Sequence, residues 1–277
     1  MSVTDTVLER IISAGERNRI CSRSDYSDSE GFLCCGVCGQ RKEAMISFGN
    51  GRDRKVPVIC ACYEEKLRRE KENEWNKKVC IRKEKCFSHA EMLHNTFEND
   101  NGVQPKMKIG REYVRHWKEA AKENAGLLLL GGVGTGKSYC ACAIANALCE
   151  KDISVRFVNL AEVLNELQSC PDRNEVVRNL TTCALLIIDD FGIQRNTEYA
   201  NEQVFNLLDS RDRSGKPLIV TTNMTYRELT EPADTRQERI FSRLRKMCTP
   251  VLFEGEDLRE REGNRKKNII SSFFPAS

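Results

Sequence analysis

The apolar and polar positions from about residue 95 onward fall into short apolar runs that alternate with longer segments of helical spacing. The predicted strands are residues 127–130, 153–158, 184–189, 217–222 and 249–253. The predicted helices are residues 109–124, the alanine-rich stretch up to 148, 161–167, 174–181, 198–213 and 236–247. Because strands and helices alternate, the pattern predicts an α/β domain with a five-stranded parallel sheet covered on both faces.

The first predicted strand leads into GGVGTGKS, in which Gly131, Gly136, Lys137 and Ser138 fit the pattern G-x-x-x-x-G-K-[ST]. Glycines allow backbone N–H groups to curve around phosphate oxygens, the lysine reaches the β- and γ-phosphates, and the serine holds Mg²⁺. A glycine-rich turn that binds nothing is disfavoured, because the pattern stands between a strand and a helix. The predicted ATP-binding residues are Gly131, Gly132, Val133, Gly134, Thr135, Gly136, Lys137, Ser138 and Tyr139.

Two further strands end in polar side chains. The run ALLIID is followed by a second acid, so that Asp189 and Asp190 stand at the end of a buried strand. Asp189 is predicted to orient Mg²⁺, and Asp190 to polarise an attacking water. Asn223 follows the strand PLIVTT, where an amide can sense the γ-phosphate or, alternatively, cap the next segment.

Composition narrows the class of protein. The net charge of +3 over 277 residues gives no global attraction to nucleic acid. The longest purely apolar run, residues 127–130, is too short to cross a membrane, and the start lacks the pattern of a signal peptide. Fourteen cysteines then argue for reduced thiols, some of them on a metal. We expect a cytoplasmic protein with no membrane partner.

Four of the cysteines have the spacing of a zinc site. Cys35 and Cys38 form one tight pair, and Cys60 and Cys62 a second, as a closed tetrahedral Zn²⁺ site requires. The second pair is C-x-C rather than C-x₂-C, and Cys34 could replace Cys35. Free cysteines are the alternative. A small domain with few large apolar residues would take much of its stability from the metal.

The remaining segments are predicted to be polar or basic. Residues 1–20 have the spacing of a short amphipathic helix, and residues 63–84 read as a solvated helix between two domains rather than a nucleic-acid contact. Arg236, Arg239 and Arg243 align on one helix face, which is either solvated or reaches a neighbouring subunit. The predicted boundaries are a zinc domain at 1–64, a linker at 65–94, an ATPase domain at 95–262 and a basic, disordered tail at 263–277.

Four motifs in order, GGVGTGKS, LLIIDDFG, LIVTTNM and ERIFSRLRKM, resemble the AAA+ ATPases of the DnaC/DnaI type. These bacterial and phage factors load the replicative helicase onto DNA. The resemblance covers about residues 95–260, and the cysteine module is similar to the zinc-containing, helicase-contacting domain of the DnaI branch. It implies that Asp189 and Asp190 form the Walker B motif, Asn223 is sensor 1, Arg243 the arginine finger and Arg259 the sensor-2 arginine.

The chain departs from this family at Asp190, where many AAA+ proteins carry the longer glutamate, which bears on hydrolysis more than on ATP binding. The sequence after the last predicted strand leaves no room for the separate helical lid of most AAA+ proteins. Loaders of this type also lack that lid. The resemblance implies a self-oligomer that binds a replicative hexameric DNA helicase and single-stranded DNA. The alternatives are an IstB-type transposition helper ATPase and a zinc-dependent adaptor that uses ATP as a structural ligand. A small-molecule kinase is disfavoured, because no lid-like arginine cluster is visible in the sequence.

Overall fold

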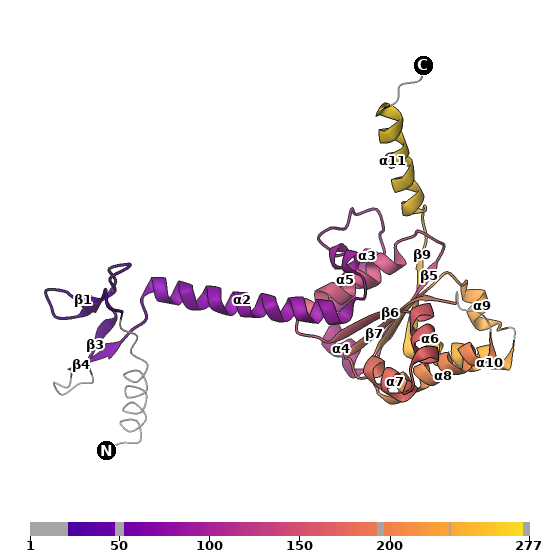
Figure 1. Cartoon of the computed structure of the whole chain (residues 1–277), viewed down its shortest axis with the longest axis horizontal. Coiled ribbons are helices and arrows are strands. Elements are labelled where there is room, and N and C mark those ends of the chain that lie inside the picture. Colours follow the sequence, from indigo (N-terminus) through magenta and orange to yellow (C-terminus); the bar gives the residue numbers. More distant parts are fainter. Residues whose placement is uncertain (1–21, 48–52, 193–196, 233, 274–277) are drawn as a thin grey trace. The chain divides into compact units, whose positions relative to one another are not determined.

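The computed structural model describes residues 22–47, 53–192, 197–232 and 234–273 (Figure 1). The chain divides into two compact units, Met1–Lys77 and Lys78–Ser277, so the division lies inside the predicted linker. The helix predicted over residues 1–20 and residues 274–277 of the predicted tail lie outside the described residues. None of the helices in the described ranges is long and apolar enough to span a bilayer.

The first unit contains two small antiparallel sheets. Strand β1 (Tyr26–Ser27) pairs with β2 (Leu33–Cys34), and β3 (Glu43–Ser47) pairs with β4 (Asp53–Pro57). Helix α2 (Ala61–Cys86) follows, close to the predicted 63–84, and only Cys86 of it is buried. Its surface carries ion pairs one turn apart, such as Glu65 with Arg68 and Arg69, which support an exposed helix.

The second unit is built on a five-stranded parallel sheet, as predicted. Its strand order is β6–β7–β8–β5–β9, in which β5 (Gly126–Gly131) lies between two strands that come later in the sequence. The other strands are β6 (Val155–Asn159), β7 (Leu185–Phe191), β8 (Leu218–Thr222) and β9 (Cys248–Phe253). The carboxyl ends of β5, β7 and β8 therefore meet at one edge, which is where open α/β sheets bind ligands.

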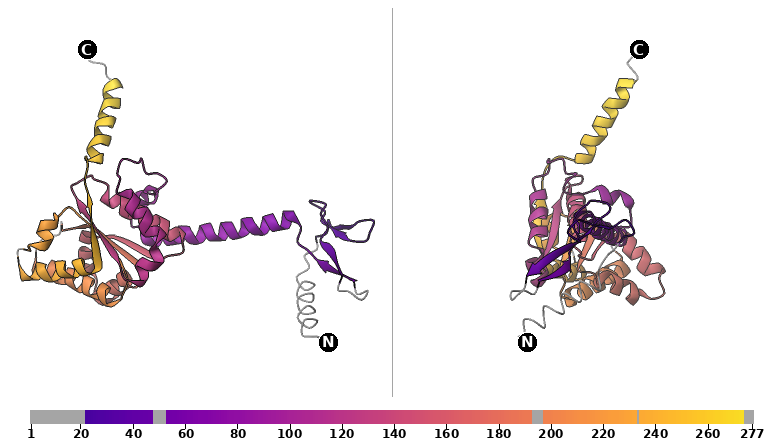
Figure 2. Two further views of the ribbon diagram at one scale, coloured as in Figure 1. Left: turned by 180° about the vertical axis from the view of Figure 1, so that it is seen from behind. Right: turned by 90° about the vertical axis from the view of Figure 1, so that its left-hand side faces the viewer.

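Alternating side chains of the strands build a core on each face of the sheet. Leu127 and Leu129 face one core and Leu128 and Leu130 the other. The first core contains α3 (Met107–Arg115), α4 (Trp117–Lys122) and α5 (Lys137–Glu150). The second contains α6 (Leu160–Ser169), α7 (Arg173–Thr181), α8 (Glu198–Arg213) and α10 (Thr235–Met247). Figures 1 and 2 show these helix layers on either side of the sheet.

Two sequence predictions differ from the structure. The single helix predicted over residues 109–124 is broken at His116, whose φ of −98° and ψ of 26° leave the helical region, although no helix-breaking residue marks this position. The tail predicted to be disordered from residue 263 is instead part of helix α11 (Leu258–Phe273). Asp257 explains the start of this helix, because its carboxylate accepts the backbone N–H groups of Arg259 and Glu260. The remaining short helices are η1 (Ala90–His94) and α9 (Tyr226–Thr230).

Arg211 on α8 has a fully buried side chain that ties three segments together. Its guanidinium donates to the backbone carbonyls of Thr181, Cys183, Ala184 and Pro217, at distances from 2.5 to 3.2 Å. Burial lowers the pKa of this arginine, opposed by the nearby Cys183 thiol. The side chain thus satisfies carbonyl groups at the end of α7 and the beginnings of β7 and β8.

Replacing Arg211 by methionine is expected to lower the free energy of unfolding by about 3 kcal/mol or more, since each orphaned buried carbonyl costs about 1–3 kcal/mol. Arg213→Met is the matched control on the same helix. Arg213 is exposed and pairs with Asp209, so its loss is expected to cost less than about 1 kcal/mol. Urea unfolding curves measure both changes, and equal shifts of the midpoint would contradict the assigned role.

Candidate nucleotide and metal sites

The loop between β5 and α5 has the backbone that phosphate binding requires. Gly134 and Gly136 have positive φ angles of 73° and 92°, and no side chain caps the first turn of α5. A Cβ on Gly134 would lie 1.8 Å from Asp257 Oδ1, and one on Gly131 would lie 2.1 Å from the Phe253 carbonyl oxygen. Only glycine fits these two positions, and the uncapped N-terminus of α5 is available to an anion.

Lys137 is the first residue of α5, and its side chain is almost completely buried. Its Nζ donates to the carbonyl oxygens of Gly131 (2.9 Å) and Gly132 (2.6 Å) and to Asn223 Oδ1 (2.9 Å). Burial lowers the pKa of the ammonium group, and the charges of Asp190 and Asp189 oppose this. The structure therefore brings the predicted lysine and the predicted sensor asparagine, which are 86 residues apart, into direct contact.

The predicted magnesium ligands also meet. Asp189 at the end of β7 is buried and accepts hydrogen bonds from the hydroxyl groups of Thr221, at 2.6 Å, and Ser138. Burial raises the pKa of its carboxyl group, and these hydrogen bonds act in the opposite direction. A serine hydroxyl beside a carboxylate is the hard oxygen donor set that suits Mg²⁺. Ser138 and Asp189 would hold such an ion, whose charge would offset that of the β- and γ-phosphates.

Asp190 occupies an irregular position. In the register of β7 and β8, Ile188 pairs with Val220 and Phe191 with Thr222, so two residues of β7 stand opposite the single residue Thr221. This is the geometry of a β-bulge, a feature that re-aims side chains near active sites. Asp190 has a φ of 56°, and it lines the cavity in front of the loop. The bulge explains how the second of two consecutive acids on one strand reaches the cavity.

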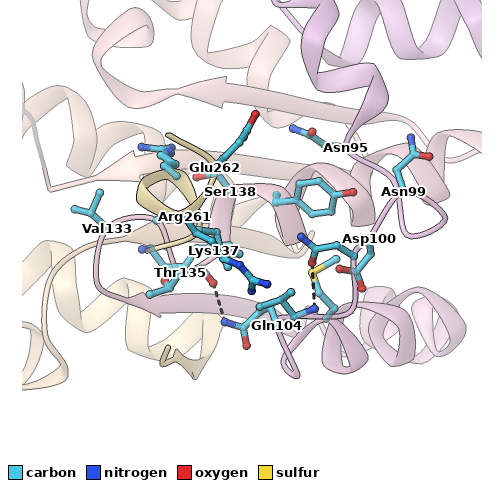
Figure 3. A pocket seen from close by; sticks show the side chains of 18 of the residues that line it. Asn95, Asn99, Asp100, Gln104, Val133, Thr135, Lys137, Ser138, Arg261 and Glu262 are labelled. Carbon is cyan, nitrogen blue, oxygen red and sulfur yellow. Dashed lines mark hydrogen bonds between the residues drawn. The ribbon is translucent and has the colours of Figure 1, made fainter. Parts of the chain in front are cut away.

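A cavity of about 670 Å³ opens in front of the loop (Figure 3). This is the size of a typical small-molecule site. The predicted residues that line it are Val133, Gly134, Thr135, Gly136, Lys137, Ser138, Tyr139, Asp190, Asn223 and Arg259. Gly131, Gly132, Asp189 and Arg243 do not line it, although Asp189 lies directly behind Ser138. The residues that bear the three strand-end motifs thus converge on one space.

Residues 63–266 match the protein family described as IstB-like ATP binding protein. The chain belongs to this family. The replicative helicase loader DnaI of Bacillus subtilis is 25% identical over 189 residues, which cover 62% of this chain and 61% of DnaI. The replicative helicase loader DnaC of Escherichia coli is 27% identical over 149 residues, 52% of this chain and 58% of DnaC. An ATP-binding protein of a Mycobacterium tuberculosis insertion sequence is 28% identical over 151 residues, 53% of this chain and 59% of that protein.

Solved structures of the same group share the fold. The crystal structure of DnaI has a TM-score of 0.52 and 23% identity, and covers 62% of this chain and 94% of that one. The DnaC helicase loader has a TM-score of 0.53 and 18% identity, and covers 60% and 100%. The prediction of an AAA+ ATPase of the DnaC/IstB group is therefore confirmed at the level of family and fold. The chain spans about three-fifths of the length of the curated relatives named above.

Sequence reasoning missed half of the cavity wall. One missed part is the loop before α3, where Gln104 donates through Nε2 to the carbonyl oxygens of Thr135 (2.7 Å) and Glu254 (3.2 Å) (Figure 3). Gln104 thereby links this loop to the phosphate loop and to the end of β9. The other part is the first two turns of α11, which place Arg261 and Arg265 beside the predicted Arg259. The basic segment from residue 263 was predicted to be disordered, so the helix that brings these three arginines to the cavity was not expected.

Arg243, the predicted arginine finger, lies on α10 away from the cavity of its own chain. Its guanidinium pairs with Asp209 and, at 3.9 Å, with Asp212, and stacks over the Phe205 ring at 4.7 Å. Its Nε is buried without a hydrogen-bond partner. Within one chain, these contacts hold Arg243 against α8 and away from the cavity. A role of Arg243 in catalysis therefore requires a second copy of the chain.

The predicted zinc ligands form the one group of three or more cysteine, histidine or acidic side chains with metal-site spacing in the described ranges. The sulfurs of Cys35, Cys38, Cys60 and Cys62 all lie within 4.8 Å of one another. The Cys62 sulfur lies 3.5 Å from that of Cys35 and 3.4 Å from that of Cys60. Bonds of about 2.3 Å in a tetrahedron place sulfurs about 3.8 Å apart, so the four residues fit Zn²⁺.

The hydrogen bonds around the sulfurs favour a thiolate at Cys35 and disfavour one at Cys62. Backbone N–H groups of Cys38 and Val37 lower the pKa of the Cys35 thiol, and the hydrogen-bonded sulfurs of Cys60 and Cys35 raise that of Cys62. The Cys34 thiol is outside the group, because it faces the Asp28 carboxylate and the Phe32 carbonyl oxygen. Burial raises its pKa. The structure therefore groups Cys35, and not Cys34, with the other three cysteines.

Proposed function

We propose that this protein is an ATP-dependent loader of a replicative DNA helicase onto single-stranded DNA, and that it works as an oligomer in the cytoplasm. The four-cysteine cluster carries this proposal, because it adds a second unit to the ATP-binding domain and resembles the helicase-contacting module of the DnaI branch. Two relatives named as replicative helicase loaders support it.

The proposed mechanism uses the arrangement of residues at the carboxyl edge of the sheet. Lys137 exchanges its contacts with Gly131, Gly132 and Asn223 for the β- and γ-phosphates of ATP. Asp189 and Ser138 would hold Mg²⁺, which would offset the charge of the phosphates, and Asp190 orients the attacking water with Asn223 beside the γ-phosphate. Arg243 of one subunit reaches the ATP of the next, so that hydrolysis loosens the contact between subunits and releases the helicase.

Co-purification tests this proposal. The tagged chain is mixed with the replicative hexameric helicase of its host, with and without ATP, and the recovered helicase is quantified. We expect ATP-dependent recovery, and release when ATP is hydrolysed in the presence of single-stranded DNA. The variant with Lys137 replaced by alanine is the control, because it removes nucleotide dependence without altering the cysteine unit. Failure to recover the helicase in either state would refute the loader function.

An IstB-type transposition helper is the second candidate, and the relative from an insertion sequence favours it. Recovery of a transposase instead of the helicase would establish it. A zinc-dependent adaptor that binds ATP only as a structural ligand is the third candidate. Asp190 favours it, because its side chain is shorter than the glutamate that many AAA+ proteins use for hydrolysis. ATP turnover stimulated by DNA or by the helicase would exclude that adaptor.

Arg243→Ala is expected to leave ATP binding unchanged and to reduce ATP turnover in the oligomer by about 1,000-fold, the usual contribution of an arginine finger. Arg239→Ala is the matched control, since Arg239 lies one turn away and stacks over the same Phe205 ring at 4.2 Å. Turnover is measured over a range of protein concentrations, with circular dichroism as a check on folding. Full turnover in Arg243→Ala, or loss of turnover in Arg239→Ala alone, would overturn the assignment.

A further inference from the structure

Thr221 is a completely buried residue on β8 that does not line the cavity in front of the phosphate loop. It lies within the motif LIVTTNM, but it is not among the residues predicted to bind ATP. Its hydroxyl group has two partners, both on β7. Oγ1 donates to Asp189 Oδ1 at 2.6 Å, and it accepts the backbone N–H of Asp190 at 3.0 Å. One hydroxyl group therefore contacts both acids of the proposed magnesium and water site.

The chemistry of the two partners fixes the direction of these bonds. A hydroxyl group has one hydrogen to donate and lone pairs to accept with. Because the Asp190 N–H can only donate, it occupies a lone pair of Oγ1, and the single hydrogen of Thr221 is left for Asp189. The Thr221 hydroxyl group thus orients the Asp189 carboxylate through a hydrogen bond in a buried environment, where such bonds are strong.

The same contact stabilises the β-bulge. Asp189 and Asp190 stand opposite Thr221 alone, and Asp190 has a φ of 56°, an uncommon conformation for a residue other than glycine. Such conformations persist where the surroundings hold them. The bond from the Asp190 N–H to Thr221 supplies that hold, and the bulge turns the Asp190 side chain toward the cavity.

We propose that Thr221 is a positioning residue for the magnesium–ATP site, which orients Asp189 and fixes the bulge that presents Asp190. This inference rests on the proposed binding of magnesium and ATP, and not on helicase loading. Residues that orient metal ligands in this way commonly change metal affinity by about 10- to 100-fold when they are replaced.

Thr221→Val, which keeps the shape and removes the hydroxyl, tests the proposal. A fluorescent, non-hydrolysable ATP analogue is bound to the full chain, first in EDTA and then at increasing Mg²⁺ concentrations. We expect the Mg²⁺ midpoint to rise by about 10-fold or more, with the affinity in EDTA within about twofold of wild type. Thr221→Ser restores the hydroxyl and is expected to return the midpoint to near the wild-type value.

Thr222→Val is the matched control, because Thr222 is the next residue of β8, is equally buried, and directs its hydroxyl to the Phe191 carbonyl oxygen at 2.6 Å. A purely structural effect of losing a buried hydroxyl would move both variants alike. An unchanged midpoint in Thr221→Val, or equal changes in both valine variants, would refute the role of Thr221. Wild-type binding without any Mg²⁺ dependence would instead refute the magnesium site itself, and the comparison keeps the two failures apart.

Discussion

Replacing Lys137 by alanine is expected to abolish detectable ATP binding. Hydrogen bonds to charged groups contribute about 1.5–3 kcal/mol each, so the loss of two phosphate contacts weakens binding by on the order of 100-fold or more. The lysine is buried in the phosphate loop, and its Nζ already faces three oxygen acceptors. In the variant nothing replaces its positive charge next to the phosphates. Equilibrium binding of a fluorescent ATP analogue measures the effect.

The control for this experiment is Lys151→Ala. Lys151 follows the C-terminal end of α5, whereas the phosphate loop precedes the N-terminal end, and it donates to the Val114 carbonyl oxygen at 3.1 Å. The Lys151→Ala variant is expected to bind ATP with the affinity of the wild type. Thermal unfolding checks that both variants are folded. ATP affinity within tenfold of wild type in the Lys137 variant would show that the cavity is not the nucleotide site.

Removing the metal is expected to unfold the first unit and to leave the second folded. Within the described residues, the buried apolar side chains of the first unit are only Phe32 and three cysteines, Cys34, Cys35 and Cys60. Several larger apolar side chains, such as Val37 and Ile59, are exposed instead. So small a core cannot offset the chain entropy of folding, whereas structural zinc contributes about 10–16 kcal/mol at neutral pH.

Cysteine variants and metal analysis test this expectation. The wild-type chain should contain one zinc ion, Cys35→Ser should contain much less, and Cys34→Ser should keep it, because the Cys34 thiol faces Asp28. Hydrogen exchange should show loss of protection over residues 22–47 and 53–60 in the metal-free chain. Retained protection after chelation, or loss of zinc in Cys34→Ser alone, would contradict the assigned ligand set.

Contiguous motifs allowed much of the ATP site to be predicted. The glycines, Lys137 and Ser138 lie within eight consecutive residues, and their roles follow from a short loop between a strand and a helix. Strand positions followed from runs of apolar residues, and the five-stranded sheet agrees with them. The errors came from weaker local signals. Asp257 was not recognised as the start of α11, so the tail was wrongly predicted to be disordered from residue 263.

The sequence by itself determined the five strands of the parallel sheet and most of the helices that cover it, the match to a triphosphate-binding motif, and the cysteine pairs that have metal-site spacing. Each of these depends on residues close together in the chain. Only the tertiary structure decided that Thr221 faces both acids of β7, that Arg243 pairs with Asp209, and that α11 and the loop around Gln104 complete the cavity. The reason is physical: these contacts depend on strand order and helix packing, which join side chains that local spacing does not relate.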